Sequence, residues 1–216
     1  MSLAWQGSLF DDDSRSDAPA RDELAFYGVQ RIALDDRCWL DVIRSWLPDH
    51  DVLFDELRRD TPWQQRERRM WDRDVLEPRL VAAWSGESLT ELPDRLEAVR
   101  RAVGGRYGVE FDSVLVNLYR DGRDAVAWHG DTVRHRLPEC VVVTVGLGER
   151  RRFLLRPGTS GPASRTMTSG EGDLVVMGGR TQHEWQHTVP KASRAGARMS
   201  VTMRHSRPLP PPRPED

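Results

Sequence analysis

The sequence predicts an α+β domain whose β part is a sandwich. Patterns typical of helices occupy the first half of the chain, and short strand patterns separated by Gly- and Pro-rich turns dominate from Phe111 onward. A chain of 216 residues is long enough for one domain with a sizeable core. Its 38% hydrophobic and 31% charged residues are typical of a globular protein. We therefore expect a single domain over residues 23–206.

Both ends of the chain differ from this central part. Residues 1–22 are acidic and poor in core-forming side chains, and we expect a mobile acidic tail there. Residues 207–216 are rich in proline, which cannot join a helix or a central strand. We therefore expect a Pro-rich tail after the domain.

Composition also bounds where the protein acts. The first residues lack the basic start and apolar core of a signal peptide, and no run of about 18 apolar residues could cross a membrane. Cys38 and Cys140 are too few for a disulfide framework and suit a reducing compartment. We expect a cytoplasmic monomer without a membrane partner.

Three helices are expected before the strands. The first would begin at a cap on Asp35 or Asp36, and its apolar residues fall at helical spacing: Trp39, Val42, Ile43, Trp46 and Leu47. The second would be capped by Asp49, with Val52, Leu53 and Leu57 on one side. The third would run from about Leu92 to Val103 and end at Gly104-Gly105.

Five strands follow in the second half of the chain. Each is a short run of β-branched and apolar residues bounded by turn residues. Their expected ranges are Ser113–Tyr119, Cys140–Gly146, Arg152–Arg156, Asp173–Met177 and Arg198–Arg204.

Two histidines and one aspartate form a candidate metal site. His129 and Asp131 are two residues apart, so in an extended chain both side chains face the same way. His187 lies in a later extended segment that ends at Pro190. Two imidazoles and one carboxylate can cap one face of iron(II) and leave the other face open, although zinc could use the same ligands. We treat the remaining histidines as surface residues: His50, His135, His183 and His205.

The last predicted strand carries two arginines on one face. Arg198, Ser200, Thr202 and Arg204 alternate with Met199, Val201 and Met203, so one face is polar and the other apolar. An inward arginine is costly without a partner, and a dicarboxylate would be such a partner. A solvated face on an edge strand is the alternative. Beside the metal motif, the arginine pair is typical of an iron(II) oxygenase that uses 2-oxoglutarate.

Asn117 and Tyr119 form a second pair on one strand face. An amide and a phenol can both donate hydrogen bonds to carboxylate oxygens, so these two residues suit the same dicarboxylate. A buried pair with purely structural hydrogen bonds is the alternative.

The charge distribution gives weak support for a nucleic-acid partner. Residues 1–60 carry a net charge of −7, which leaves about +5 on the rest of the chain, and 31 of the 32 basic residues are arginine. Arginine forks suit phosphate groups. Three basic clusters lie in the positive part: Arg66-Glu-Arg68-Arg69, Arg134-His-Arg136 and Arg150-Arg151-Arg152. Compositional drift is the alternative explanation.

Four stretches together resemble the AlkB family. They are Asn117-Leu-Tyr-Arg-Asp-Gly122, Trp128-His-Gly-Asp131, Trp185-Gln-His-Thr-Val-Pro190 and Arg198-x5-Arg204. The resemblance is densest over 111–204 and extends back to about residue 60. It implies a double-stranded β-helix, or jelly-roll, core with the N-terminal helices packed on it. It also implies an iron(II)/2-oxoglutarate dioxygenase that removes alkyl lesions from nucleic-acid bases, and the first stretch is most similar to the DNA-repairing branch.

The resemblance assigns roles to individual residues. It implies that His129, Asp131 and His187 hold iron(II), and that 2-oxoglutarate contacts Asn117, Tyr119, Arg198, Thr202 and Arg204. Trp84 would be the aromatic residue that stacks on a flipped base. Thr132 departs from the pattern, because some members have an acidic residue there that contacts the base.

We therefore expect an enzyme that uses Fe(II), 2-oxoglutarate and dioxygen to demethylate bases of the 1-methyladenine and 3-methylcytosine type in DNA. Alkylated nucleic acid, in particular DNA, is the expected partner. Two alternatives stay open. The first is a 2-oxoglutarate dioxygenase acting on RNA, protein or a small molecule, and the second is a non-catalytic module that binds damaged bases.

Overall fold

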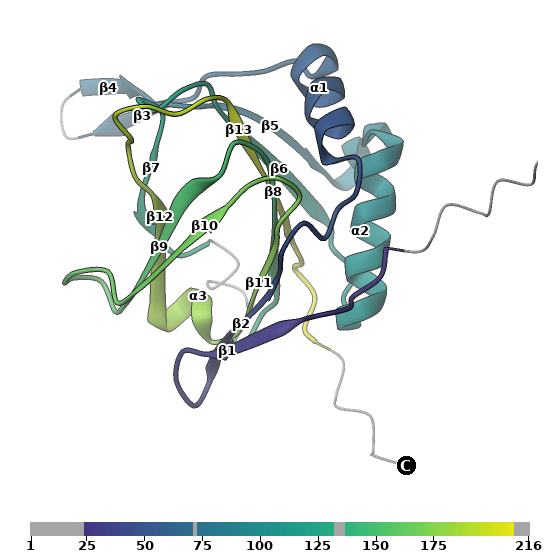
Figure 1. Ribbon diagram of the computed structural model, residues 1–216, viewed down its shortest axis with the longest axis vertical. Helices are drawn as coiled ribbons and strands as arrows, with labels where there is room; N and C mark the ends of the chain where they lie inside the picture. Colours follow the sequence, from purple (N-terminus) through teal and green to yellow (C-terminus); the bar gives the residue numbers. More distant parts are fainter. Residues whose placement is uncertain (1–23, 71–72, 132–136, 210–216) are drawn as a thin grey trace, which may run out of the picture.

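The computed structural model describes residues 24–70, 73–131 and 137–209. The predicted acidic tail (1–22), Thr132, the cluster at 134–136 and residues 210–216 of the Pro-rich tail lie outside these residues. The described chain forms three layers, which are a small sheet, a large sheet and two helices (Figure 1). Among the described residues, no helix is long and apolar enough to span a membrane.

The large sheet is the middle layer and has seven antiparallel strands in the order β1-β2-β11-β8-β13-β6-β5. In that order the strands are Gln30–Ala33, Cys38–Ile43, Leu174–Gly179, Val142–Gly148, Arg198–Arg204, Ser113–Tyr119 and Leu80–Ser85. Because β13 lies between β8 and β6, the strand with the two arginines is central to the sheet.

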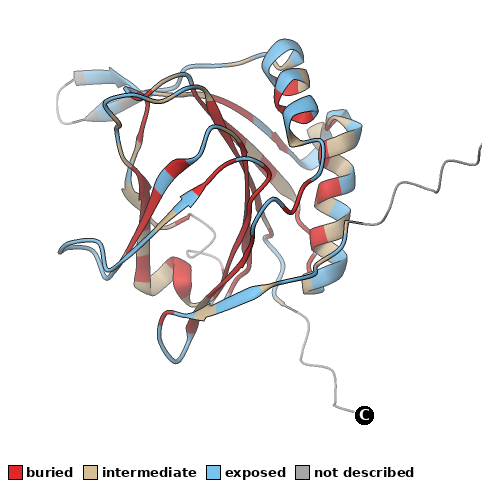
Figure 2. Ribbon diagram, viewed as in Figure 1, coloured by how far each residue is buried: buried red, intermediate tan, exposed pale blue. Residues whose placement is uncertain are grey.

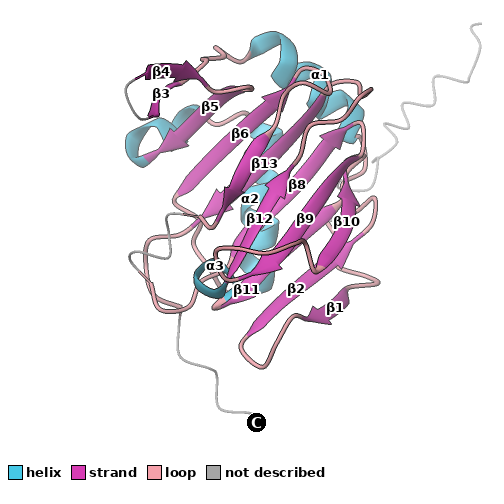
Figure 3. Cartoon of the chain, turned by 90° about the vertical axis from the view of Figure 1, so that its left-hand side faces the viewer, coloured by secondary structure: helices cyan, strands magenta, loops and turns pink. Residues whose placement is uncertain are grey.

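The small sheet has four strands in the order β10-β9-β12-β7, and it lies in front of the large sheet in the turned view of Figure 3. These strands are Arg165–Ser169, Arg151–Pro157, Trp185–Val189 and Val126–His129. The short helix α3 (Thr181–Glu184) directly precedes β12. A separate hairpin of β3 (Glu67–Met70) and β4 (Arg73–Leu76) projects beside β5 in Figure 1.

The helices α1 (His50–Asp60) and α2 (Asp94–Tyr107) cover the outer face of the large sheet, and the 3-10 helix η1 (Gly86–Glu91) leads into α2. One hydrophobic core fills the space between these helices and the sheet, and a second core lies between the two sheets. Figure 2 shows the buried residues concentrated on the strands of the two sheets. This arrangement confirms the predicted jelly-roll core with helices packed on it.

The first predicted helix is wrong, because residues 38–43 form strand β2. Cys38, Leu40 and Val42 belong to the core between the sheets, whereas Ile43 belongs to the core below the helices. A strand buried on both faces has a nearly continuous apolar run, and such a run can imitate helical spacing.

The second and third predicted helices are present, and the third has different ends from those predicted. Asp49 occupies the N-cap position of α1 but has a left-handed backbone and makes no capping hydrogen bond, and Val52 is exposed. The helix α2 continues through Gly104 and ends at Gly108, which adopts φ 64°. At Gly104 a Cβ would lie 2.7 Å from the carbonyl oxygen of Val109, so this glycine permits close packing of the chain rather than ending the helix.

All five predicted strands are present, and those at Ser113–Tyr119 and Arg198–Arg204 match to the residue. The strands at 142–148, 151–157 and 174–179 differ from the predicted ends by one to two residues. Several strands carry no clear alternation and were not predicted, including β5 and β10.

Candidate active site

A cavity of about 900 Å³ opens between the two sheets. It is lined by strands of both sheets, so residues far apart in the sequence meet there. All the sequence-predicted site residues line it: Trp84, Asn117, Tyr119, His129, Asp131, His187, Arg198, Thr202 and Arg204.

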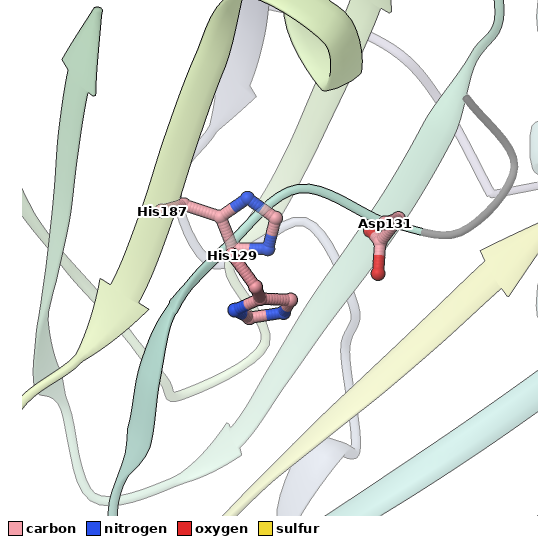
Figure 4. Close-up of side chains that lie close together, drawn as sticks. All are labelled: His129, Asp131 and His187. Atoms are coloured by element: carbon pink, nitrogen blue, oxygen red, sulfur yellow. The ribbon is translucent and has the colours of Figure 1, made fainter. Parts of the chain in front are cut away.

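The two histidines and the aspartate lie together in the lining of this cavity. His129 ends β7 and is directly opposite His187 on β12, and the two ring centroids are 4.3 Å apart. Asp131 follows two residues after His129. One ligand atom from each residue lies within 4.8 Å of the others, and Figure 4 shows the three side chains as neighbours. Such a group can hold one metal ion.

The protonation states of this group suit a metal. Burial lowers the pKa of His187 to about 3, and the nearby His129 contributes in the same direction, so the ring is neutral at neutral pH. Burial opposes the ionisation of Asp131, but Arg204 and the two imidazoles hold its pKa below the ordinary value. Nδ1 of His129 lies 2.8 Å from the carbonyl oxygen of Ala127, so a proton on Nδ1 would leave Nε2 free to bind.

Asp131 is fixed by two hydrogen bonds, whereas its second carboxylate oxygen has no partner within the described residues. Its Oδ1 accepts a hydrogen bond of 2.5 Å from Nη2 of Arg204, and its backbone N–H donates to Oε1 of Gln182 at 2.8 Å. Its Oδ2 is buried without a hydrogen-bond partner in the described chain. A buried carboxylate oxygen without a partner is costly, and a bound cation would satisfy it. The three side chains therefore fit a metal ion such as iron(II).

The polar face of β13 points into the cavity. Met199, Val201 and Met203 are fully buried in the core below the helices, so the alternate residues face the other way. The edge-strand alternative is excluded because β13 pairs on both sides.

Arg198 is the most unusual residue on this face. Its side chain is fully buried, with Nε donating to the carbonyl oxygen of Ser169 at 3.0 Å, and its guanidinium lies over the ring of Tyr119. Its Nη1 has no hydrogen-bond partner within the described residues, and burial lowers its pKa. Nε of Arg204 also lacks a partner there. These unsatisfied donors fit an anion such as a carboxylate.

Asn117 and Tyr119 face the cavity beside Arg198, and both are buried. Thr202 lies further along β13 and is also buried. Trp84 lines the cavity from β5, but only 9% of it is exposed and it packs in the core below the helices. The structure therefore brings eight of these residues to one polar face or metal group. Trp84, which is opposite Val114 on β6, belongs to the core below the helices and only borders the cavity.

The basic clusters contribute less than their sequence suggests. Arg150 pairs with Glu171 and Asp173, and Arg151 is buried with its guanidinium donating to carbonyl oxygens of the chain. Arg150 and Arg152 are exposed, but Arg150 is already paired with two carboxylates. Two other exposed cations line the cavity, Arg66 and Lys191.

The surface assignment of His205 is wrong. This histidine is buried, its Nε2 accepts a hydrogen bond from the backbone N–H of Val141, and its Nδ1 lies 2.6 Å from the carbonyl oxygen of Arg207. Its role is to fix the chain after β13.

Three polar residues that support the site were not predicted. Gln182 holds the backbone of Asp131, Ser169 holds Arg198, and Arg79 donates to Asn117. Each is distant in sequence from the residue it contacts, and no local pattern marks it.

A second group of possible metal ligands is already neutralised within the protein. It consists of Asp35, Cys38 and Glu184. Glu184 pairs with Arg37 and Arg180, and burial raises the pKa of the Cys38 thiol to about 12. A thiol that stays protonated is a poor metal ligand, so we assign this group a structural role.

Comparisons with known proteins agree with this geometry. The model of the 2OG-Fe(II) oxygenase superfamily matches residues 46–207. The chain is 29% identical to the DNA oxidative demethylase ALKBH2 of Arabidopsis thaliana, over 88% of this chain and 71% of that protein. It is 33% identical to the alpha-ketoglutarate-dependent dioxygenase alkB homolog 3 of Bos taurus, over 67% of this chain and 57% of that protein.

The chain thus spans a little more than half the length of its alkB homolog 3 relative. Among solved structures, OsALKBH1 superposes with a TM-score of 0.57 at 14% identity, covering 82% of this chain and all of that one. At that identity the likeness shows a shared fold.

Proposed function

Because the chain belongs to the 2OG-Fe(II) oxygenase superfamily and, within it, to the AlkB family, we propose that it oxidatively demethylates alkylated bases in DNA. Lesions of the 1-methyladenine and 3-methylcytosine type are the proposed substrates. The observation that carries the proposal is one cavity that holds both a His-Asp-His group and a buried arginine with an unsatisfied donor.

The proposed roles divide the cavity lining into a metal group and an adjoining cosubstrate site. His129, Asp131 and His187 would hold Fe(II), and the 2-oxoglutarate site would consist of Asn117, Tyr119, Arg198, Thr202 and Arg204. When bound, Fe(II) with 2-oxoglutarate and dioxygen supplies the oxidation that hydroxylates a methyl carbon, with succinate and carbon dioxide as coproducts. The hydroxylated methyl group then leaves the base nitrogen as formaldehyde.

The chain's own residues prepare this reaction. Arg204 fixes the orientation of Asp131, and Gln182 fixes its backbone, so the carboxylate is held before any metal binds. Arg198 offers a desolvated positive charge to a carboxylate deep in the cavity.

The nucleic-acid substrate is supported by the relatives and by the cavity edge. The plant relative is named a DNA oxidative demethylase. A base inside a duplex cannot reach a buried metal, so it must be flipped out of the stack. Trp84 is the proposed stacking residue, and the exposed Arg66 and Lys191 are suitable contacts for phosphates.

The monomeric state stays a prediction. One domain over residues 23–206 and a cytoplasmic location stay predictions.

The proposal is tested by 2-oxoglutarate turnover with different second substrates. Purified protein with Fe(II) and ascorbate should release succinate faster with alkylated DNA than with unmodified DNA, alkylated RNA or a protein mixture. If RNA or protein stimulates turnover more than alkylated DNA does, the proposed DNA substrate is wrong, but the proposed 2-oxoglutarate oxygenase activity stands. Absence of iron-dependent succinate release would favour a non-catalytic binding module.

A further inference from the structure

The side-chain amide of Asn117 has one defined orientation, and Arg79 sets it. Nε of Arg79 lies 2.9 Å from the amide atom that faces it. A guanidinium can only donate hydrogen bonds, so that amide atom must be the oxygen Oδ1. The NH₂ group of Asn117 is consequently turned the other way, toward Oγ of Ser200 on β13.

Arg79 is itself held in place. Its Nη2 lies 2.9 Å from Oε2 of Glu77, and the exposed fractions of the two side chains are 14% and 18%. The backbone between them is also fixed, because the carbonyl oxygen of Pro78 accepts a hydrogen bond from the N–H of Ala125. Arg79 therefore approaches Asn117 from a rigid segment just before β5.

The NH₂ group of Asn117 still has capacity to bind a ligand. Its contact with Ser200 is long, at 3.4 Å, and an amide nitrogen carries two hydrogens. Asn117 is directly opposite Ser200, and Tyr119 is directly opposite Arg198, on the same face of the sheet. The amide hydrogens are thus presented on the face that carries the unsatisfied Nη1 of Arg198.

We propose that Arg79 is a positioning residue for the cosubstrate: by fixing the amide of Asn117 with its donors toward the cavity, it sets the affinity for 2-oxoglutarate. This inference rests on the proposed function, because it assumes that the carboxylate ligand of this face is 2-oxoglutarate. Glu77 acts one step further away, by restraining Arg79.

A positioning role differs from direct contact in a measurable way. If Arg79 acts through Asn117, its replacement has no further effect once the amide is gone. If Arg79 binds the cosubstrate directly, the two replacements act independently. If it acts only as a positive charge, Arg79→Lys keeps the affinity, whereas the loss of the Nε contact predicts that lysine fails.

The test is calorimetric titration of 2-oxoglutarate into the Mn(II)-loaded full chain. The variants are Arg79→Met, Arg79→Lys, Asn117→Ala, Arg79→Met with Asn117→Ala, and Glu77→Gln. Arg100→Met is the matched control, since Arg100 is also partly buried and paired, with Glu97 on α2, but lies outside the cavity lining. Circular dichroism and the melting temperature establish that each variant folds.

We expect Arg79→Met and Arg79→Lys to raise the Kd for 2-oxoglutarate about tenfold, and Glu77→Gln to raise it about threefold. The double variant should match Asn117→Ala within about twofold. For Arg79→Met and Arg79→Lys, kcat at saturating 2-oxoglutarate should stay within about twofold of the unmodified enzyme. Arg100→Met should leave the Kd unchanged. The inference about Arg79 would be overturned if the increases in Kd from the two single replacements multiply in the double variant, or if Arg79→Met leaves the Kd unchanged. Neither result would contradict the proposed function. An unmodified protein that binds no 2-oxoglutarate would overturn the proposed function as well.

Discussion

Nη2 of Arg204 lies 2.5 Å from Oδ1 of Asp131, and this ion pair joins the two sheets. Arg204 ends β13 in the large sheet, whereas Asp131 follows β7 of the small sheet. The pair is largely buried, with exposed side-chain fractions of 17% and 4%. It places the arginine strand of the proposed cosubstrate site directly against the proposed metal group.

Replacing Arg198 by methionine should separate binding from folding. Methionine fills a similar volume without a buried charge, so the melting temperature of the ligand-free protein should change by only a few degrees. The Kd for 2-oxoglutarate should rise by about 30-fold or more, because a charge-assisted hydrogen bond is lost. Thermal unfolding with and without 2-oxoglutarate measures both effects. A strongly destabilised protein that still binds 2-oxoglutarate would show that Arg198 is purely structural.

Replacing Gln182 by methionine should weaken metal binding. The change removes the acceptor for the backbone N–H of Asp131. Loss of such a supporting contact typically costs about 10-fold or more in metal affinity. Titration with Co(II), followed by its visible absorption, measures this. Thr181→Val is the control, since Thr181 is equally buried on α3 and donates to Gly178 but does not touch Asp131. Equal losses in both variants would contradict the assigned role.

Replacing Trp84 by leucine tests the proposed stacking role. Leucine keeps an apolar side chain in the core, although it fills less volume than tryptophan, and it cannot stack on a base. We expect kcat/KM for a methylated oligonucleotide to fall by roughly tenfold, because one base–aromatic contact contributes about 1–3 kcal/mol. Substrate-free turnover of 2-oxoglutarate should be unchanged. If both activities fall in proportion, Trp84 supports the fold and does not contact the base.

Asp124 should make stability depend on pH. Burial opposes its ionisation, but the hydrogen bonds from the side chain and backbone of Arg120 hold its pKa below the ordinary value of 3.8. Because its pKa is lower in the folded chain, its stabilising contribution is complete above pH 3.8 and is lost as the pH falls below it. Asp124→Asn should therefore cost about 1–3 kcal/mol at pH 7 and less at pH 3. Urea unfolding at both pH values measures the difference, and an equal cost at both would contradict it.

The sequence is most informative where a strand has two different faces. In β13 the alternation of polar and apolar residues indicates both the strand and the direction of its arginines. In β2 both faces are buried, so the apolar residues carry no period of two and imitate a helix. Helix ends also differ from the prediction, because Gly104 serves close packing while Gly108 supplies the left-handed residue.

The sequence predicts the proposed metal and cosubstrate residues, but it does not predict the residues that hold them in place. His129 and Asp131 are near neighbours along the chain, and the spacing of their motif with His187 is itself a sequence signal. Gln182, Ser169 and Arg79 act through one or two hydrogen bonds to distant residues, and such contacts depend on how the sheets pack. The prediction for His205 is wrong for the same reason, since its partner Val141 lies 64 residues away in the sequence.

The most direct test of the central claim is the loss of one methyl group from a defined oligonucleotide. DNA or RNA carrying 1-methyladenine or 3-methylcytosine is incubated with purified protein, Fe(II), 2-oxoglutarate and ascorbate. The masses of the products are then measured by mass spectrometry. We predict the loss of one methyl mass from the DNA, formation of formaldehyde, and no loss with His129→Ala. Release of succinate without methyl loss from any nucleic acid would contradict the proposed substrate.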